Sequence, residues 1–223
     1  MGFHVKVNRY EKDILRYEKY PVETGGVLLY GSSFFDLWGY ERAKQQWADA
    51  TNGVVKVVEH GFGGASVDEL LYYYDRMVRP YAPSVAVLRC GVNDIIQGLS
   101  AQDAWFLTER LIEWLKADFP EIQIILVNIF DNKALTQERF EKCLVYNRIS
   151  ADYAEQSENV SYLDLNPFFH EHASDCGTQQ NFRDVFRADG LHLTDDGYAQ
   201  MAAFLAPKVA RLLIRKETSD CRK

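Results

Sequence analysis

Short apolar runs alternate with longer amphipathic segments along most of the chain, and this alternation restricts the fold more than any other feature. Five runs have the length and composition of strands, and each is followed by a segment with helical spacing. Such repeats form a parallel sheet with helices on both faces, and right-handed crossovers leave few topologies. The predicted strands cover residues 26–30, 54–58, 84–88, 122–127 and 160–163, and the predicted helices cover residues 36–49, 66–79, 101–117, 135–155 and 194–215.

The five repeats account for nearly all of the 223 residues. We therefore expect a single α/β domain over residues 1–223, with an N-terminal extension of about residues 1–24 and a tail of about residues 217–223. Residues 166–190 have neither pattern and form the longest predicted connection. Long connections in compact domains are often functional.

Composition and charge exclude several classes of protein. Hydrophobic residues make up 47% and charged residues 26% of the chain, which is typical of globular rather than disordered proteins. The net charge of -7 argues against a nucleic acid as the main partner. No apolar run approaches the roughly 18 residues that span a bilayer, and no apolar leader is visible, so we expect a cytoplasmic protein with no membrane partner. The four scattered cysteines favour reduced thiols over disulfides or a zinc site.

Polar and glycine-rich segments follow the predicted strands, where the ligand sites of parallel sheets lie. Ser33 follows a glycine turn, and His192 lies three residues after Asp189, so a nucleophile, a base and a carboxylate can meet at this edge. Taken alone, Ser33 is more typical of a turn or helix-capping serine, and Asp189 is more typical of a turn residue. His192 alone is more typical of a partly buried structural histidine. Their joint placement favours a hydrolytic site. The four segments are Gly31-Ser32-Ser33, Gly61-Phe62-Gly63-Gly64, Gly91-Val92-Asn93-Asp94 and Asp189-Gly190-Leu191-His192.

These four segments, in this order and at strand ends, resemble the SGNH, or GDSL-type, hydrolases over essentially the whole predicted domain. The resemblance implies a flavodoxin-like three-layer α/β/α sandwich with a five-stranded parallel sheet. It also implies that Ser33 is the nucleophile, His192 the general base and Asp189 the residue that orients the base. The oxyanion would be bound by the backbone N–H groups of Ser33 and Gly64 and by the side chain of Asn93. No metal or organic cofactor is implied.

Two positions depart from the family's pattern. Ser32 stands where the name-giving aspartate usually stands, but a subset with Gly-Ser-Ser followed by a nearby tryptophan looks similar, and Trp38 fits it. Glu59 stands where the second segment usually begins with asparagine, which leaves open how the loop carrying Gly64 is held. Glu59 at a strand end could contact His60 or a cationic group of the substrate.

Other residues could contribute to the predicted site by binding substrate or a metal ion. We expect the aromatic residues Trp38 and Phe62 close to the site, where they could bind substrate. Arg89, at the end of the third strand, either binds a carboxylate or phosphate of the substrate or pairs with an acidic neighbour. The run His170-Glu171-His172 could supply metal ligands, but no third ligand is evident, so a polar loop is favoured and no metal site is expected.

The resulting prediction is a serine esterase, a carboxylic ester hydrolase acting on small, short-chain or acetyl esters through a covalent acyl-enzyme. A non-catalytic ligand-binding module on the same fold and an acyltransferase are the alternatives. The expected partner is a small-molecule ester, such as an acetylated sugar or a lysophospholipid-like ester. The residues do not choose among these substrates and do not indicate an oligomeric state.

Overall fold

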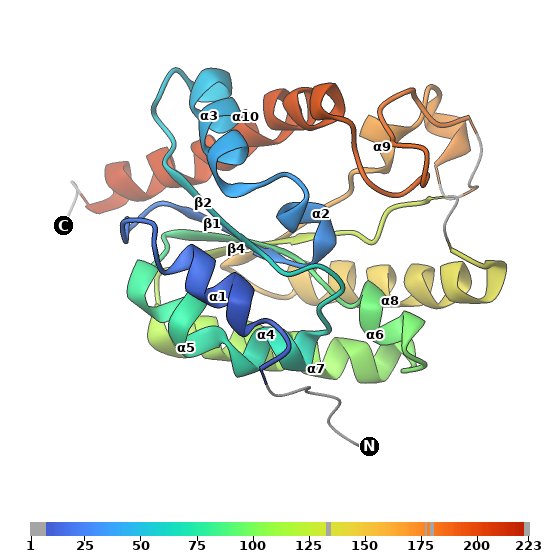
Figure 1. Ribbon diagram of the computed structural model, residues 1–223, viewed down its shortest axis with the longest axis horizontal. Helices are drawn as coiled ribbons and strands as arrows, with labels where there is room; N and C mark the ends of the chain where they lie inside the picture. Colours follow the sequence, from blue (N-terminus) through green and yellow to red (C-terminus); the bar gives the residue numbers. More distant parts are fainter. Residues whose placement is uncertain (1–7, 133–134, 177, 179–180, 221–223) are drawn as a thin grey trace.

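A five-stranded, all-parallel sheet forms the centre of the computed structural model, which describes residues 8–132, 135–176, 178 and 181–220 (Figure 1). The strand order is β2-β1-β3-β4-β5, which is the flavodoxin-like order. The predicted fold class is therefore confirmed. The strands are β1 (Val27–Gly31), β2 (Val57–Gly61), β3 (Val85–Arg89), β4 (Gln123–Val127) and β5 (Val160–Leu163).

Helices cover both faces of the sheet (Figure 1). Each face has its own apolar core, and β1, β2 and β3 are buried along their whole length. Burial on both faces explains why strands such as β1 and β3 are continuous apolar runs rather than alternating ones. One face carries α1 (Glu11–Tyr17), α4 (Val67–Tyr72), α5 (Tyr74–Met77), α6 (Val92–Ile96), α7 (Ala101–Asp118) and α8 (Gln137–Glu155). The other carries α2 (Ser33–Asp36), α3 (Tyr40–Thr51), α9 (Asn166–Phe169) and α10 (Asp195–Asp220).

The strand register brings distant parts of the sequence to one edge of the sheet. Gly31, the last residue of β1, pairs with Gly61 on one side and with Arg89 on the other. A Cβ atom at position 31 would lie 2.3 Å from the carbonyl oxygen of Arg89, so only glycine fits there. The turn that leads to Ser33 therefore starts between the ends of two neighbouring strands.

The predicted second strand is misplaced by three residues. It was expected at residues 54–58, but β2 covers Val57–Gly61, and Val54 is exposed. The difference arises because Glu59 and His60 are buried inside the strand despite their polar side chains. Each has a hydrogen-bonding partner from another element, Tyr17 for Glu59 and the carbonyl oxygen of Met77 for His60. Such compensation cannot be read from the local pattern.

Two predicted helices differ in the structure. The helix expected at residues 36–49 begins later, at Tyr40, because the chain turns at Gly39, and the separate short helix α2 precedes that turn. The helix expected at residues 66–79 is divided into α4, α5 and the short 3₁₀ helix η1 (Arg79–Tyr81). Its predicted capping box is present, with Glu69 accepting a hydrogen bond from the backbone N–H of Ser66.

Two further segments contain structure that the sequence patterns do not predict. Helix α1 lies within the predicted N-terminal extension, and its residues Ile14 and Tyr17 join the apolar core. The long connection contains α9 and the 3₁₀ helix η2 (Ala173–Asp175). Within the described residues, no helix is both long and apolar enough to cross a bilayer.

Candidate active site

A continuous hydrogen-bonded chain links Ser33, His192 and Asp189 at the carboxyl edge of the sheet. The Oγ atom of Ser33 lies 2.9 Å from Nε2 of His192, and Nδ1 of the same ring lies 2.8 Å from Oδ2 of Asp189. An ionised carboxylate only accepts hydrogen bonds, so Nδ1 carries the proton and Nε2 is left to accept from the serine hydroxyl. This is the arrangement in which a neutral imidazole can remove the proton of a serine.

A tight turn in the backbone holds the aspartate and the histidine together. Oδ1 of Asp189 accepts the backbone N–H groups of Leu191 and His192, both at 2.9 Å. Partial burial acts to raise the pKa of Asp189, but the hydrogen bonds from His192 and Leu191 outweigh it and lower the pKa to about 2. The carboxylate is therefore ionised over the whole neutral range, as the orientation of the imidazole requires.

The two adjacent serines have different environments. Ser33 is the first residue of α2 and is partly accessible, whereas Ser32 is only 1% exposed, and its hydroxyl has no hydrogen-bond partner in the described part of the chain. Only the hydroxyl of Ser33 reaches the imidazole. The structure thus distinguishes two residues that the sequence left side by side.

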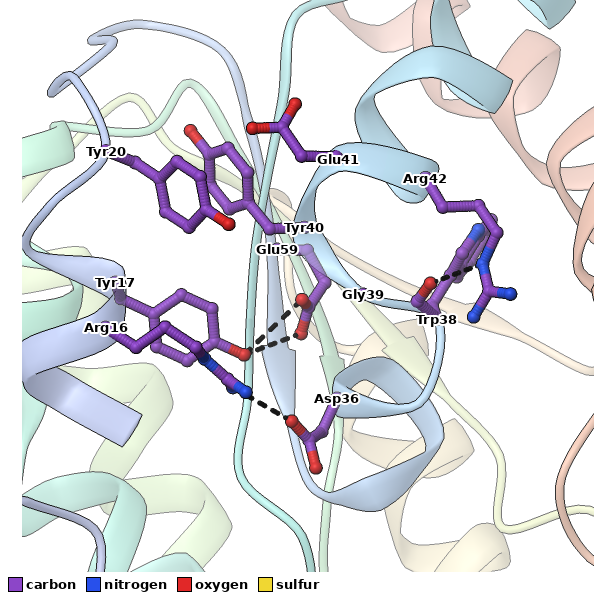
Figure 2. A pocket seen from close by; sticks show the side chains of 10 residues that line it. All are labelled: Arg16, Tyr17, Tyr20, Asp36, Trp38, Gly39, Tyr40, Glu41, Arg42 and Glu59. Carbon is purple, nitrogen blue, oxygen red and sulfur yellow. Dashed lines mark hydrogen bonds and ion pairs between the residues drawn. The ribbon is translucent and has the colours of Figure 1, made fainter. Parts of the chain in front are cut away.

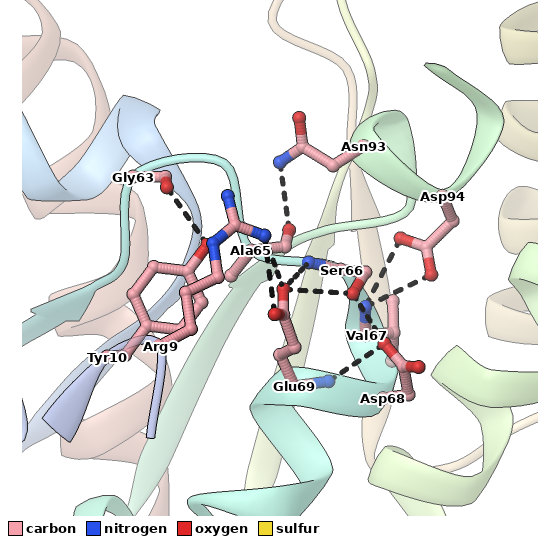
Figure 3. Close-up of polar contacts among 10 residues, drawn as sticks. All are labelled: Arg9, Tyr10, Gly63, Ala65, Ser66, Val67, Asp68, Glu69, Asn93 and Asp94. Atoms are coloured by element: carbon pink, nitrogen blue, oxygen red, sulfur yellow. Dashed lines mark hydrogen bonds and ion pairs between the residues drawn. The ribbon is translucent and has the colours of Figure 1, made fainter. Parts of the chain in front are cut away.

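Asn93, in α6, is hydrogen-bonded to the loop after β2 that carries Gly64 (Figure 3). Nδ2 of Asn93 donates to the carbonyl oxygen of Ala65 at 2.8 Å, which uses one of its two N–H groups. Gly64 has a φ of +79°, a conformation that favours glycine. The hydroxyl of Tyr10 donates to the neighbouring carbonyl of Gly63 at 3.0 Å.

Buried carboxylates hold the loop that carries Gly64 (Figure 3). Asp94, in α6, accepts the backbone N–H of Val67 at 3.1 and 3.2 Å. Glu69 accepts hydrogen bonds from Arg9 and from the backbone of Ser66. Burial raises the pKa of Asp94 to about 7. These contacts answer the question of how the loop is held when position 59 is not asparagine.

Glu59 lies in a different pocket from Ser33 (Figure 2). The pocket has a volume of ≈ 400 Å³ and is lined by residues of α1, α2, α3 and β2. Glu59 is buried, accepts the backbone N–H of Gly61 and lies 3.4 Å from the hydroxyl of Tyr17, and burial raises its pKa well above the usual range. Among the described residues, no hydrogen bond joins the side chains of Glu59 and His60, and Nδ1 of His60 is hydrogen-bonded to the carbonyl oxygen of Met77 instead.

Two residues expected close to the site are packed elsewhere, and these expectations are corrected. Phe62 is fully buried in an aromatic core with Tyr10, Tyr17 and Tyr30, because the glycine loop turns its side chain inward. Trp38 is also fully buried, with its Nε1 donating to Gln46 at 2.8 Å. Neither lines the cavity next to Ser33.

A small cavity of ≈ 40 Å³ lies against Ser33, His192 and Asn93, and Arg89 forms part of its wall. Arg89 is therefore the one expected substrate-binding residue that the structure brings to this cavity. Two of the other lining residues, Val92 and Leu191, belong to the sequence segments that suggested the site. The rest have no recognisable motif, and they are Phe34, Ile96, Asn132 and Leu135.

The histidines of the predicted polar loop have separate environments. His170 is buried, and its Nε2 lies 2.9 Å from Oδ2 of Asp131, which is also buried. His172 is exposed. Among the described residues, no group of three or more histidine, cysteine, aspartate or glutamate side chains could hold a metal ion.

Known proteins resemble this chain in sequence pattern and in fold. A family model described as the GDSL-like lipase/acylhydrolase family matches residues 29–200, whereas no curated protein matches the chain. The structure is similar to that of a GDSL-like lipase from Bacteroides thetaiotaomicron, with a TM-score of 0.69 and 18% identity over 91% of this chain and 97% of that one.

Two esterases have the same fold. The acetyl xylan esterase AlAXEase aligns with a TM-score of 0.63 and 21% identity over 82% of this chain and 96% of its own. A variant of Axe2, an acetyl-xylooligosaccharide esterase from Geobacillus stearmophilus, aligns with a TM-score of 0.63 and 17% identity over 87% and 96%. At these identities the similarity shows the fold alone.

Proposed function

This chain belongs to the GDSL-like lipase/acylhydrolase family, and on that basis we propose that it is a serine esterase that cleaves small acyl esters with Ser33, His192 and Asp189. The observation that carries the proposal is the hydrogen-bonded chain from Ser33 Oγ through both ring nitrogens of His192 to Asp189. The family consists of hydrolases, and the imidazole of His192 is hydrogen-bonded to a serine hydroxyl. Together these two facts support a mechanism in which the serine attacks an acyl group.

The first half-reaction forms an ester on Ser33. As Oγ bonds to the substrate's carbonyl carbon, its proton passes to Nε2 of His192, and the carbonyl oxygen becomes an oxyanion. The imidazolium that forms is stabilised by the ionised carboxylate of Asp189. The intermediate collapses when the bond to the alcohol oxygen breaks, and His192 returns the proton to that oxygen. The alcohol leaves, and the acyl group stays on Ser33.

The second half-reaction uses water in place of the serine hydroxyl. His192 takes a proton from the water as its oxygen bonds to the acyl carbon, and then gives the proton back to Oγ as the acyl–serine bond breaks. The products are a carboxylic acid and an alcohol, and the protein returns to its starting state.

Three donors are proposed for the oxyanion. They are the backbone N–H groups of Ser33 and Gly64 and the second N–H of the Asn93 amide. The N–H of Ser33 is at the start of α2, where helical N–H groups have no partner within the helix. Asn93 lines the same cavity as Ser33, and its bond to Ala65 fixes the orientation of the amide. Donors held in place before the reaction stabilise developing charge at low reorganisation cost.

The small cavity favours a short acyl group. Its volume of ≈ 40 Å³ has room for roughly three water molecules. The acetyl esters named for two proteins of this fold are consistent with that size.

The test uses the two adjacent serines as a matched pair. Ser33→Ala should abolish hydrolysis of p-nitrophenyl acetate and labelling by a fluorophosphonate, whereas Ser32→Ala should retain both, with activity within about threefold of wild type. A folded wild-type protein that is not labelled would instead indicate a binding module. Full activity in Ser33→Ala would remove this residue from the mechanism.

A further inference from the structure

A charged side chain lies in the core directly beside the proposed nucleophile. Arg89 is the last residue of β3, in register with Gly31, and only 2% of its surface is exposed. Its side chain lines the ≈ 40 Å³ cavity together with Ser33, Asn93 and His192. A buried arginine is normally stabilised by an ion pair or by hydrogen bonds to its guanidinium group.

The protein offers this guanidinium two aromatic rings and little else. The central carbon of the guanidinium lies 4.6 Å from the ring centre of Phe34 and 4.4 Å from that of Phe130. Nε and Nη2 are buried without a hydrogen-bond partner, and no carboxylate of the described residues forms an ion pair with Arg89. Burial lowers the pKa of Arg89 to about 10, so the group is still charged at neutral pH. Two ring faces compensate only part of the cost of burying a charge.

Two other arginines show what a structural arginine does in this fold. Arg183 also lies against a ring, that of Phe168, but it donates to the carbonyl oxygen of that residue and to Gln200. Arg187 donates to the carbonyl oxygen of Leu193. Arg89, in contrast, donates no hydrogen bond to a described residue. No acidic side chain of the described residues pairs with it, which removes the structural role that the sequence left open for it. Its Nε and Nη2 donors therefore lack a partner among the described residues, although the side chain borders a cavity that a substrate group could enter.

We propose that Arg89 is a specificity residue that binds a carboxylate carried by the acyl part of the substrate, so that the preferred esters are half-esters of small dicarboxylic acids. This inference rests on the proposed function. The guanidinium, held mainly by ring contacts, can turn its N–H groups toward a carboxylate and form the charge-assisted bonds that arginine makes best. The smallest acyl groups of this kind are malonyl and succinyl, which have one and two carbons between the ester carbonyl and the carboxylate.

The experiment compares esters that differ only in that carboxylate. Release of ethanol is measured from monoethyl malonate and monoethyl succinate, and from ethyl propionate and ethyl butyrate, in which a methyl group replaces the carboxylate. In the wild-type protein, kcat/KM for the half-esters should exceed that for the neutral esters by at least about tenfold. In Arg89→Met, the ratio of the two should fall roughly 10- to 100-fold, with Arg89→Lys in between.

Matched controls separate this effect from general damage. Arg183→Met removes a ring-stacked arginine outside the cavity and should leave the ratio unchanged. A second pair of substrates, acetoxyacetate and ethyl acetate, places the carboxylate in the alcohol part. An Arg89-dependent preference for acetoxyacetate would overturn the placement of the anion in the acyl part.

The result remains decisive if Arg89→Met does not fold. In that case the wild-type preference is the test, together with competitive inhibition by succinate, which should be stronger than that by the neutral succinamide. A wild-type protein that favours neutral esters, with turnover that depends on Ser33, would overturn this inference and leave the proposed function intact. Failure of the proposed function is distinguished by the absence of Ser33-dependent turnover and of fluorophosphonate labelling.

Discussion

Two histidine–aspartate pairs in the described part of the chain have nearly the same geometry and very different surroundings. The distance from His192 Nδ1 to Asp189 is 2.8 Å, and that from His170 Nε2 to Asp131 is 2.9 Å. The side chains of His192 and Asp189 are 15% and 48% exposed, whereas those of His170 and Asp131 are completely buried.

The difference lies in what surrounds each pair. In the first pair the second ring nitrogen faces Ser33 Oγ next to a cavity, so a proton can move between groups that a substrate can reach. In the second pair the ring is packed against Phe182 inside the protein. A histidine–carboxylate bond is thus not by itself a sign of catalysis; access and a third group decide its role.

The largest expected effect comes from breaking the exposed pair. Asp189→Asn should lower kcat for p-nitrophenyl acetate by roughly 10⁴-fold, because an amide no longer holds the imidazole in the tautomer that accepts the serine proton. Steady-state kinetics measures this, and circular dichroism should show an intact fold. A variant with wild-type kcat would mean that Asp189 does not orient the base.

The next largest effect is expected at Asn93, which lines the same cavity as Ser33 and His192. Asn93→Ala should lower kcat by roughly 10²- to 10³-fold with a smaller change in KM, since an oxyanion donor acts mainly in the transition state. Asn93→Asp is a useful companion, because it keeps the size of the side chain but places a negative charge near the oxyanion. If both variants keep the wild-type kcat, Asn93 has no such role.

The buried pair should respond in the opposite way. Asp131→Asn should leave kcat within about threefold but lower the free energy of unfolding by about 1–3 kcal/mol, because it weakens a hydrogen bond that no water can replace. Urea denaturation measures the loss. If this variant is stable and inactive, the two pairs do not differ as described.

The smallest expected effect tests another buried carboxyl group, that of Glu59. Burial raises the pKa of Glu59, so the folded protein binds this proton more tightly than the unfolded chain, and stability is lost as the pH rises from the ordinary glutamate pKa through the raised value. Glu59→Gln cannot ionise and should therefore lose less stability than wild type as the pH is raised from about 5 to about 9.

This prediction is checked by urea denaturation of both proteins at each pH. Asp94, whose pKa is about 7, titrates in the same range in both proteins, so only the difference between the two pH profiles reports on Glu59. Parallel profiles would contradict the prediction.

Much of the fold was predictable from local patterns. β1 and β3 are continuous apolar runs because helices cover both faces of the sheet, and the capping box at Ser66 and Glu69 marks the start of α4. The patterns failed where a tertiary partner compensates a polar residue. The sequence pattern places Glu59 and His60 after the second strand, but both lie inside β2. Their polar side chains can be buried there because Tyr17 and the carbonyl oxygen of Met77 form hydrogen bonds with them.

The candidate site was predictable to a similar extent. The segments after the strands named Ser33, Asn93, Asp189 and His192, since the chemistry of a parallel sheet gathers at its carboxyl edge. They also suggested Phe62 and Trp38, which are packed in the cores. No local pattern distinguishes an aromatic side chain that points into a cavity from one that points into a core.

The sequence by itself determined the class of fold, the strands that border the site and the residue types available for chemistry there. Only the tertiary structure decided that His192 meets Ser33 across 159 positions of sequence, that Ser32 is enclosed, and that Arg89 lies between two rings with no carboxylate partner among the described residues. The physical reason is that strand composition and turn chemistry are local, whereas burial and pairing depend on which distant segments pack together.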